Sequence, residues 1–297
     1  YEIRLSLVGS EMCIRDSIMR AARKQLGLTQ EEVSRHLGIS QSALSKLEHG
    51  SLIVSAPQWF EFCALTQIRP DSLLSGQIDR LKQAVVSDNP REGTFKLPRR
   101  YSLYRGSKVR AMLPFLSFLN GAVGDKKARE FFKHHKVDSD FFIDLDNQLS
   151  LEFTLDVVRY LIDQRLFKSR DMSKLVKPVS LAAMHGTLHE RYLASGSKAE
   201  LLRQVVMNAR LYECNFSYRI EDSKKSTVDL SVTPERHLQE ISYRTDSALG
   251  DFLCQYKKHY FERFLQYGET GQGRAGSVEE LECHYHGAER CVYRFQT

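Results

Sequence analysis

The chain has 297 residues, of which 42% are hydrophobic and 27% charged, with a formal net charge of +6; this balance is typical of an ordinary folded protein and excludes wholesale disorder. No window approaches the roughly 18 to 20 consecutive apolar residues of a transmembrane helix, and the start of the chain lacks the basic-then-apolar order of a secretory signal. Six cysteines are too sparse for a secreted disulfide scaffold. We therefore expect a cytoplasmic protein without membrane contact, whose cysteines are thiols or ligands.

The beginning of the chain contains the stretch SLVGSEMCIRDS, which has no clear structural period. It resembles the translated adapter read-through that occurs at the ends of reading frames predicted from environmental sequence assemblies. We expect residues 1–16 to be a non-native leader and Cys13 to have no function.

From Ile18 the sequence reads IMRAARKQLGLTQEEVSRHLGISQSALSKLEHG, with apolar residues at helical spacings. Thr29 followed by Glu32 is a capping box, which predicts the start of one helix. Ser40 predicts the start of the next helix, and Gly38 supplies the turn between them. Because turn and caps agree with the apolar spacing, the stretch predicts a helix-turn-helix.

This stretch and the following SAPQWFEFCALTQ resemble the phage-repressor-like, or XRE-type, helix-turn-helix family, and we assign residues 17–76 to an all-α, five-helix domain of this type. In that family the helix after the turn lies in the major groove of double-stranded DNA and reads base edges. The resemblance implies base contacts from Gln41, Ser42, Ser45 and Lys46, and phosphate contacts from Gln30 and His49. It also implies a buried salt bridge between Arg23 and Glu48. Solvated polar residues on an exposed face are the alternative for Gln41 and Lys46.

The positive charge is concentrated in residues 77–110, which contain nine Lys or Arg against three acidic residues. Such a run can follow a phosphate backbone, or it can be a solvated tether. Pro90, Gly93 and Pro98 interrupt any regular pattern here. We therefore expect a basic linker over residues 77–105.

The remaining residues, 106–297, alternate between helical and strand patterns and predict a second, α+β domain of a multidomain protein. The expected order is helices, β-hairpin, helix, β-hairpin, with helices over 109–120, 125–135, 151–167, 184–194 and 198–212, a hairpin over 214–234, a helix over 246–268 and closing strands within 278–296.

Two parts of this domain resemble known modules of bacterial regulators. Residues 131–234, through HHKVDSDFF and LEFTLDVVRYLIDQ, resemble the arabinose-binding type of domain in AraC-family regulators, which implies sensing or oligomerisation. Residues 211–297 resemble the 4-vinyl reductase type of domain, which occurs in activators that sense aromatic compounds. In the latter family a helix cysteine, a Glu-x-x-Cys and a further cysteine bind zinc, and this implies a site at Cys254, Glu280, Cys283 and Cys291.

Three thiolates and one carboxylate can close a tetrahedral zinc site without leaving a position for water, which is typical of a structural metal. His284 and His286 are rival ligands to Glu280. The cysteines can alternatively be unmetallated core thiols or a redox pair.

The sequence contains no P-loop, dinucleotide-binding glycine motif, nucleophile elbow or zinc-protease motif, so we expect a regulator rather than an enzyme. Our hypothesis is a homodimeric, DNA-binding transcriptional regulator that binds an operator, whose second domain senses a small aromatic effector, dimerises, or both. The alternatives are a permanent protein-interaction platform without a ligand, and a small-molecule enzyme fused to a DNA-binding domain. An effector pocket, or simply core, is expected from the aromatic residues Phe216, Tyr218, Tyr243, Phe252, Tyr256, Tyr260 and Phe261.

Overall fold

The computed structural model describes residues 11–82, 85–86, 95–168, 171–177, 179–224, 226–240, 247–268 and 277–296. Residues 1–10 of the expected leader and Tyr243 lie outside this set, while residues 11–16 form the start of the first helix. None of the helices within these ranges combines the length and the apolar character that a membrane crossing requires.

The amino-terminal region is a small all-helical unit, called the head below. Its helices are α1 (Glu11–Gln25), α2 (Gln30–His36), α3 (Gln41–Glu48), α4 (Ala56–Thr66) and α5 (Ser72–Ser75). The predicted capping box between Thr29 and Glu32 is present at the start of α2, and Ser40 accepts a hydrogen bond from the Ala43 amide at the start of α3. The head has its own core, which includes Leu44, Leu47 and Trp59. The helix-turn-helix fold predicted for this region is confirmed.

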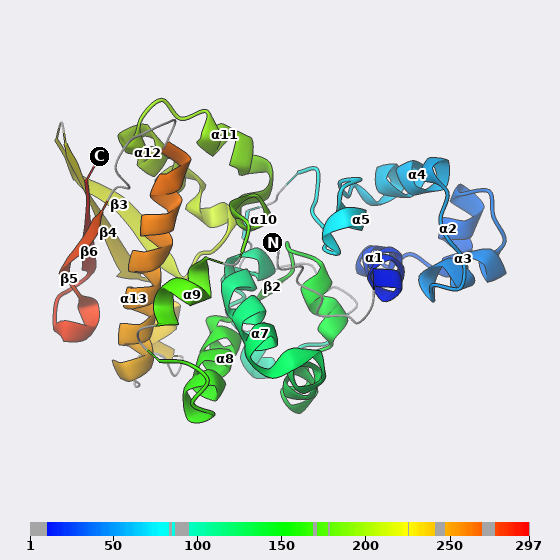
Figure 1. Ribbon diagram of the computed structural model, residues 1–297, viewed down its shortest axis with the longest axis horizontal. Helices are drawn as coiled ribbons and strands as arrows, with labels where there is room; N and C mark the ends of the chain where they lie inside the picture. The colour runs from blue at the N-terminus through cyan, green and yellow to red at the C-terminus, as the bar shows by residue number, and fades with distance from the viewer. Residues whose placement is uncertain are drawn as a thin grey trace.

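The second region is the α+β domain, shown at the left of Figure 1. Its helical part contains α6 (Arg99–Ser102), α7 (Val109–His134), the short 3₁₀ helix η1 (Ser139–Ile143), α8 (Leu151–Asp163), α9 (Met172–Val176), α10 (Leu181–His185), η3 (Gly186–Leu188), α11 (His189–Leu193), α12 (Lys198–Asn208) and η4 (Ala209–Leu211). The helices expected over 109–120 and 125–135 form the single element α7, which is interrupted at Gly124, where φ is +76°. A small two-stranded sheet joins β1 (Ser107–Lys108) to β2 (Gln148–Leu149).

The two strand pairs of the carboxy-terminal part form one sheet. Strands β3 (Phe216–Ser223), β4 (Thr227–Pro234), β5 (Val278–Glu282) and β6 (Cys291–Gln296) are antiparallel, in the order β3-β4-β6-β5. Helix α13 (Ser247–Phe264), continued by η7 (Leu265–Gly268), separates the two pairs in the sequence and packs across the sheet (Figure 1). Phe261 of α13 contacts the rings of Tyr293 and Phe295 on β6. The predicted α+β order is confirmed, and the joining of both strand pairs through β4 and β6 adds to it.

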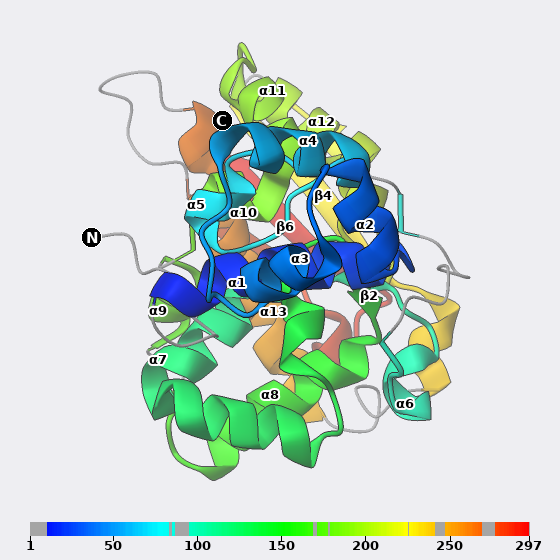
Figure 2. The same cartoon turned by 90° about the vertical axis from the view of Figure 1, so that its right-hand side faces the viewer.

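The head and the α+β domain are joined by backbone hydrogen bonds and by buried ion pairs. Ile78 donates through its amide to the Ile143 carbonyl at 2.7 Å and accepts from the Leu145 amide at 3.1 Å. Ile143 itself belongs to the core of the head. Figure 2, viewed from the side of the head, shows α3 in front of α1 and therefore on the side away from the α+β domain.

The expectation that the basic residues of the 77–110 stretch follow phosphates or lie in solvent is wrong for three of them. Lys108 and Arg110 are fully buried, and Arg80 is largely buried. Lys108 pairs with Asp146 at 2.8 Å, and Arg80 pairs with Asp144 at 2.6 Å. These cations have carboxylate partners far along the chain, which local charge counting cannot reveal.

The Arg80–Asp144 pair allows a stability prediction. Replacing Arg80 by Ala leaves the Asp144 carboxylate, which is 1% exposed, without its cation, so we expect a loss of about 3 kcal/mol in the free energy of unfolding. Urea denaturation followed by circular dichroism measures this loss. Arg69→Ala is the control, because the Arg69–Asp71 pair is 40% and 57% exposed and is expected to contribute less than about 1 kcal/mol. Equal losses in both variants would contradict the buried role of Arg80.

Candidate functional sites

The first candidate site is the outer face of α3. Leu44 and Leu47 are buried and fix this helix against the head, while Gln41, Ser42 and Lys46 are exposed. Ser45 is partly buried on the same helix. One side of α3 is therefore packed against the head, and the opposite side is exposed and could enter a DNA groove.

The residues around α3 hold it through charges. The Arg23 guanidinium donates to both carboxylate oxygens of Glu48, at 2.5 and 2.8 Å, and Glu48 is 1% exposed. The structure therefore contains the salt bridge that the family resemblance implied. Gln30 donates to Glu48 at 2.9 Å, and His49 donates through Nδ1 to the Ser45 carbonyl at 2.7 Å. Gln30 and His49 thus both brace the carboxy-terminal end of α3, in addition to the phosphate contacts expected of them.

The second candidate site is a cluster of three thiols and one carboxylate. Cys254 comes from α13, Glu280 from β5, and Cys283 and Cys291 from the two ends of the turn between β5 and β6. One ligand atom from each residue lies within 4.8 Å of those of the others. The four residues singled out by the sequence are therefore brought together, and they can bind a metal ion.

The turn explains why the cysteines meet. Between them lie the short helix η8 (His284–His286) and Gly287, whose φ of +97° favours glycine and lets the chain reverse. The rival ligands point elsewhere: His284 Nδ1 contacts the Ala288 carbonyl at 3.2 Å, and the side chain of His286 is 68% exposed. Among the described residues, the group that assembles contains Glu280 and no histidine.

The electrostatics of the cluster favour a thiolate at Cys291, whereas the hydrogen bond to Cys291 raises the pKa of Cys254 and burial raises the pKa of Cys283 to about 11. Cys254 lies 3.3 Å from Cys291, sulfur to sulfur, and its hydrogen bond lowers the pKa of Cys291, as does the His284 amide, 3.3 Å from the same sulfur. Oε1 of Glu280 is buried, and no described residue forms a hydrogen bond with it. A cation between these groups would satisfy both the thiolate and the carboxylate oxygen.

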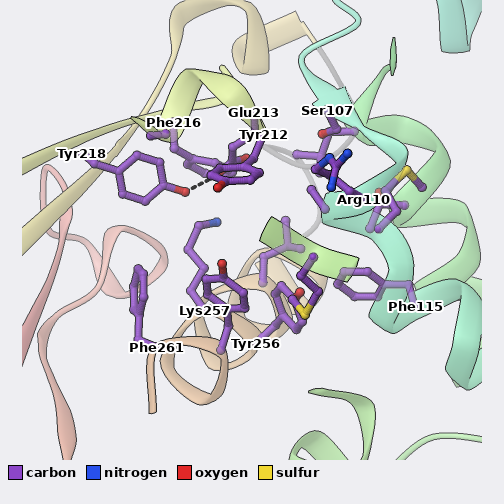
Figure 3. Close-up of a pocket in the computed structure, with 18 of the residues that line it drawn as sticks. Ser107, Arg110, Phe115, Tyr212, Glu213, Phe216, Tyr218, Tyr256, Lys257 and Phe261 are labelled. Carbon is purple, nitrogen blue, oxygen red and sulfur yellow. Dashed lines mark hydrogen bonds between the residues drawn. The ribbon is translucent and has the colours of Figure 1, made fainter. Parts of the chain in front are cut away.

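The third candidate site is a cavity of about 110 Å³ between α7, α8, α12, β3 and α13 (Figure 3). Five of the aromatic residues expected near a pocket line it: Phe216, Tyr218, Tyr256, Tyr260 and Phe261. Phe252 lies in the core instead. The walls are mainly apolar, and burial raises the pKa of Tyr218, Tyr256 and Tyr260, so these phenols stay neutral.

Three charged residues also line this cavity, and the sequence did not predict them there: Arg110, Glu213 and Lys257. Glu213 accepts a short hydrogen bond from the Tyr218 hydroxyl. One signal in the sequence could have identified Lys257. Leu253, Lys257 and Phe261 are spaced by four residues, which places the lysine on the apolar stripe of α13.

Arg110 connects the cavity to the head. Its guanidinium donates to the Asp79 carboxylate at 2.8 Å and to the Ala183 carbonyl at 3.0 Å. The backbone carbonyl of Asp79 accepts from the Arg69 amide of the head at 2.8 Å. The buried Arg110 side chain therefore links the cavity wall to Asp79, whose backbone is hydrogen-bonded to the head.

Comparison with known families bears on the head alone. Residues 19–73 match the family model described as helix-turn-helix, and this match suggests a DNA-binding transcriptional regulator. No curated protein and no solved structure matches the chain. The resemblances of the α+β domain to the arabinose-binding and 4-vinyl reductase types are not supported by these comparisons.

A pH prediction follows from His185, which contacts the Tyr260 hydroxyl behind the cavity wall. This side chain is 1% exposed, and its Nε2 and Nδ1 lie 2.6 and 2.8 Å from the hydroxyls of Tyr260 and Tyr267. Burial lowers its pKa to about 3, whereas an unfolded histidine titrates near its ordinary value of about 6.5. Between these values the unfolded chain binds a proton that the folded chain does not. Stability should therefore fall as the pH drops from 6.5 toward 3, by up to about 1.4 kcal/mol per pH unit.

Urea unfolding between about pH 4 and 7.5 tests this dependence. The His185→Gln variant should show a flatter loss of stability toward low pH, because the amide does not titrate. His134→Gln, at an exposed position, should retain the wild-type slope. The same slope in both variants would show that another group is responsible.

Proposed function

We propose that the protein is a transcriptional regulator that binds operator DNA through the head. The observation that carries this proposal is the helix-turn-helix match together with α3, which presents Gln41, Ser42 and Lys46 outward. Glutamine can bond adenine with two hydrogen bonds, lysine prefers guanine or phosphate, and serine accepts several partners. Ser45 completes the proposed reading face, and Gln30 and His49 are proposed to contact phosphates.

Binding as a homodimer follows from the size of this face. One short helix reads only a few base pairs, so two half-sites supply the specificity that an operator requires. The α+β domain is the part of the chain proposed to dimerise.

The α+β domain is also proposed to sense a small aromatic molecule. The cavity supports a sensor over a permanent interaction platform, and its volume of about 110 Å³ is comparable to an engineered cavity of about 150 Å³ that binds benzene. A ligand in contact with Arg110 would alter the pairing of that guanidinium with Asp79, and so the geometry of the head. It would act only as far as its affinity differs between the two arrangements.

For the thiol cluster we propose a structural zinc ion held by Cys254, Glu280, Cys283 and Cys291. Four protein ligands complete a tetrahedron, so the ion would have no open position for a substrate or a reactive water. This supports a regulator rather than an enzyme. The ion would fix α13 to the turn between β5 and β6.

The DNA-binding role is tested with the double variant Gln41→Ala/Lys46→Ala. An operator is first selected from a random DNA library with the wild-type protein. Loss of two base-reading side chains should then weaken binding at least about 30-fold, since each good contact contributes about 1–3 kcal/mol. Fluorescence anisotropy at fixed salt measures the affinity.

The matched control is Gln164→Ala/Lys127→Ala, which removes the same residue types from exposed positions of α7 and the end of α8. This variant should bind the operator as the wild type does. Unchanged affinity in the α3 variant would rule out α3 as the reading helix.

The zinc proposal is tested by metal analysis of reduced protein purified without a metal-affinity tag. We expect about one zinc per chain in the wild type and none in Cys283→Ser, with a melting temperature lower by roughly 5 °C or more. Chelator should bring the wild type to the same melting temperature. Cys214→Ser, outside the cluster, should keep the metal. A metal-free wild type that melts identically with and without chelator would exclude zinc.

A further inference from the structure

The side chain of Lys257 is a buried cation directed into the cavity. The residue is only 8% exposed, and it lines the cavity from α13. Figure 3 shows its ammonium pointing toward the side where Tyr218 and Glu213 lie. Within the described ranges Lys257 forms neither an ion pair nor a hydrogen bond, and its Nζ lies 3.2 Å from the centroid of the Phe216 ring.

Two further donors face the same cavity without a partner among the described residues. Oγ1 of Thr154 is buried and makes no hydrogen bond there, and the Tyr256 hydroxyl has no hydrogen-bond partner in the described part of the chain. The carboxylate of Glu213, by contrast, already accepts from Tyr218. All three groups, the Lys257 ammonium and the Thr154 and Tyr256 hydroxyls, can donate a hydrogen bond to a ligand, and one of them carries a positive charge.

This arrangement has an energetic consequence. A buried ammonium without a counter-charge at ion-pair distance costs several kcal/mol, of which a cation–π contact returns about 2 kcal/mol at best. A ligand that brings a negative charge and acceptor oxygens would offset the remainder. A neutral hydrocarbon would leave the cost in place.

We propose that the cavity binds a monocyclic arene carboxylate whose carboxylate accepts hydrogen bonds from Lys257. The inference rests on the sensor role proposed above and specifies its ligand class. A single ring suits a cavity of about 110 Å³ and its apolar walls, such as Met112, Leu253 and Phe261. A carboxylate held by Lys257 lies on the side of the cavity where Glu213 also lies, so the charge of Glu213 opposes it, and the ring of the ligand turns toward the apolar walls.

A different role for Lys257 must be separated from this one. The residue lies one helical turn after Cys254, and its charge is among the influences that lower the pKa of Cys291, after the Cys254 hydrogen bond and the His284 amide. A lysine here can neutralise the thiolates of the metal cluster instead of a ligand. In that case its removal would affect metal content, not ligand choice.

The experiment uses the full chain and three pairs of probes: benzoate, phenylacetate and cinnamate, each beside its primary amide. The amide has nearly the same shape and keeps an acceptor oxygen but lacks the charge. Isothermal titration calorimetry gives the affinities, and zinc content and melting temperature are measured on the same samples. The variants are Lys257→Met, Lys257→Arg and Glu213→Gln, with Lys258→Met, which does not line the cavity, as control.

We expect the wild type to bind at least one carboxylate about 10-fold or more tightly than its amide, because a charge-assisted hydrogen bond is stronger than a neutral one. Lys257→Met should lose this preference, keep the amide affinity, keep its zinc, and melt no lower than the wild type without ligand. Lys257→Arg should retain the preference, Glu213→Gln should strengthen carboxylate binding, and Lys258→Met should behave as the wild type.

Three results would overturn the inference. Amides that bind as tightly as the carboxylates would remove the charge requirement and leave the sensor role standing. A preference that persists in Lys257→Met while zinc is lost would assign the lysine to the metal cluster. Binding of neither class to the wild type would overturn the inference and the proposed sensor role together, while operator binding would still decide the role of the head.

Discussion

The packing of α13 against the four-stranded sheet is the constraint on which both candidate sites of the α+β domain depend. One face of this helix presents Phe261 to the rings of Tyr293 and Phe295, and Cys254 to the sulfur of Cys291. The same helix carries Lys257 and its neighbouring tyrosines into the cavity. A shift of α13 would therefore change the thiol cluster and the cavity at once. A metal ion in the cluster would fix the helix at the position that shapes the cavity.

The junction between the α+β domain and the head is held by buried ion pairs. In segment 138–147, Asp140 pairs with Arg20 of the head and Asp144 pairs with Arg80. Asp146 of the same segment pairs with the buried cations Lys108 and Arg110. Such charges lie in a region of low dielectric, where the loss of one partner is costly and intermediate arrangements are disfavoured. The junction is thus held by buried charges that depend on one another. In the proposed sensor, a ligand at the cavity would act on the DNA-binding surface through this junction.

The local features of the fold could be predicted from the sequence. Thr29, Glu32, Gly38 and Ser40 act within a few residues of themselves, so the helix-turn-helix followed from their spacing. The thiol cluster could also be predicted in part, because the turn around Gly287 brings Cys283 and Cys291 together over a short stretch. That Glu280, and not a histidine, completes it depends on where η8 directs the side chains of His284 and His286, which spacing does not define.

The features that could not be predicted are those decided by distant partners. Arg80, Lys108 and Arg110 belong to a basic run whose composition suggests solvent, and their carboxylates lie 31 to 64 residues away in the sequence. The pairing of β4 with β6 likewise joins strands that α13 separates.

The buried position of Lys257 could not be predicted from the sequence either. On a helix a lysine is ordinarily a solvated residue, and its long stem can carry the charge out of an apolar stripe. Here Nζ lies 3.2 Å from the centroid of the Phe216 ring and the residue is only 8% exposed, so the charge stays inside. Folding leaves an ammonium in a mainly apolar cavity, and evolution ordinarily removes such a group unless something binds it. The buried charge is therefore the observation from which we infer an anionic ligand.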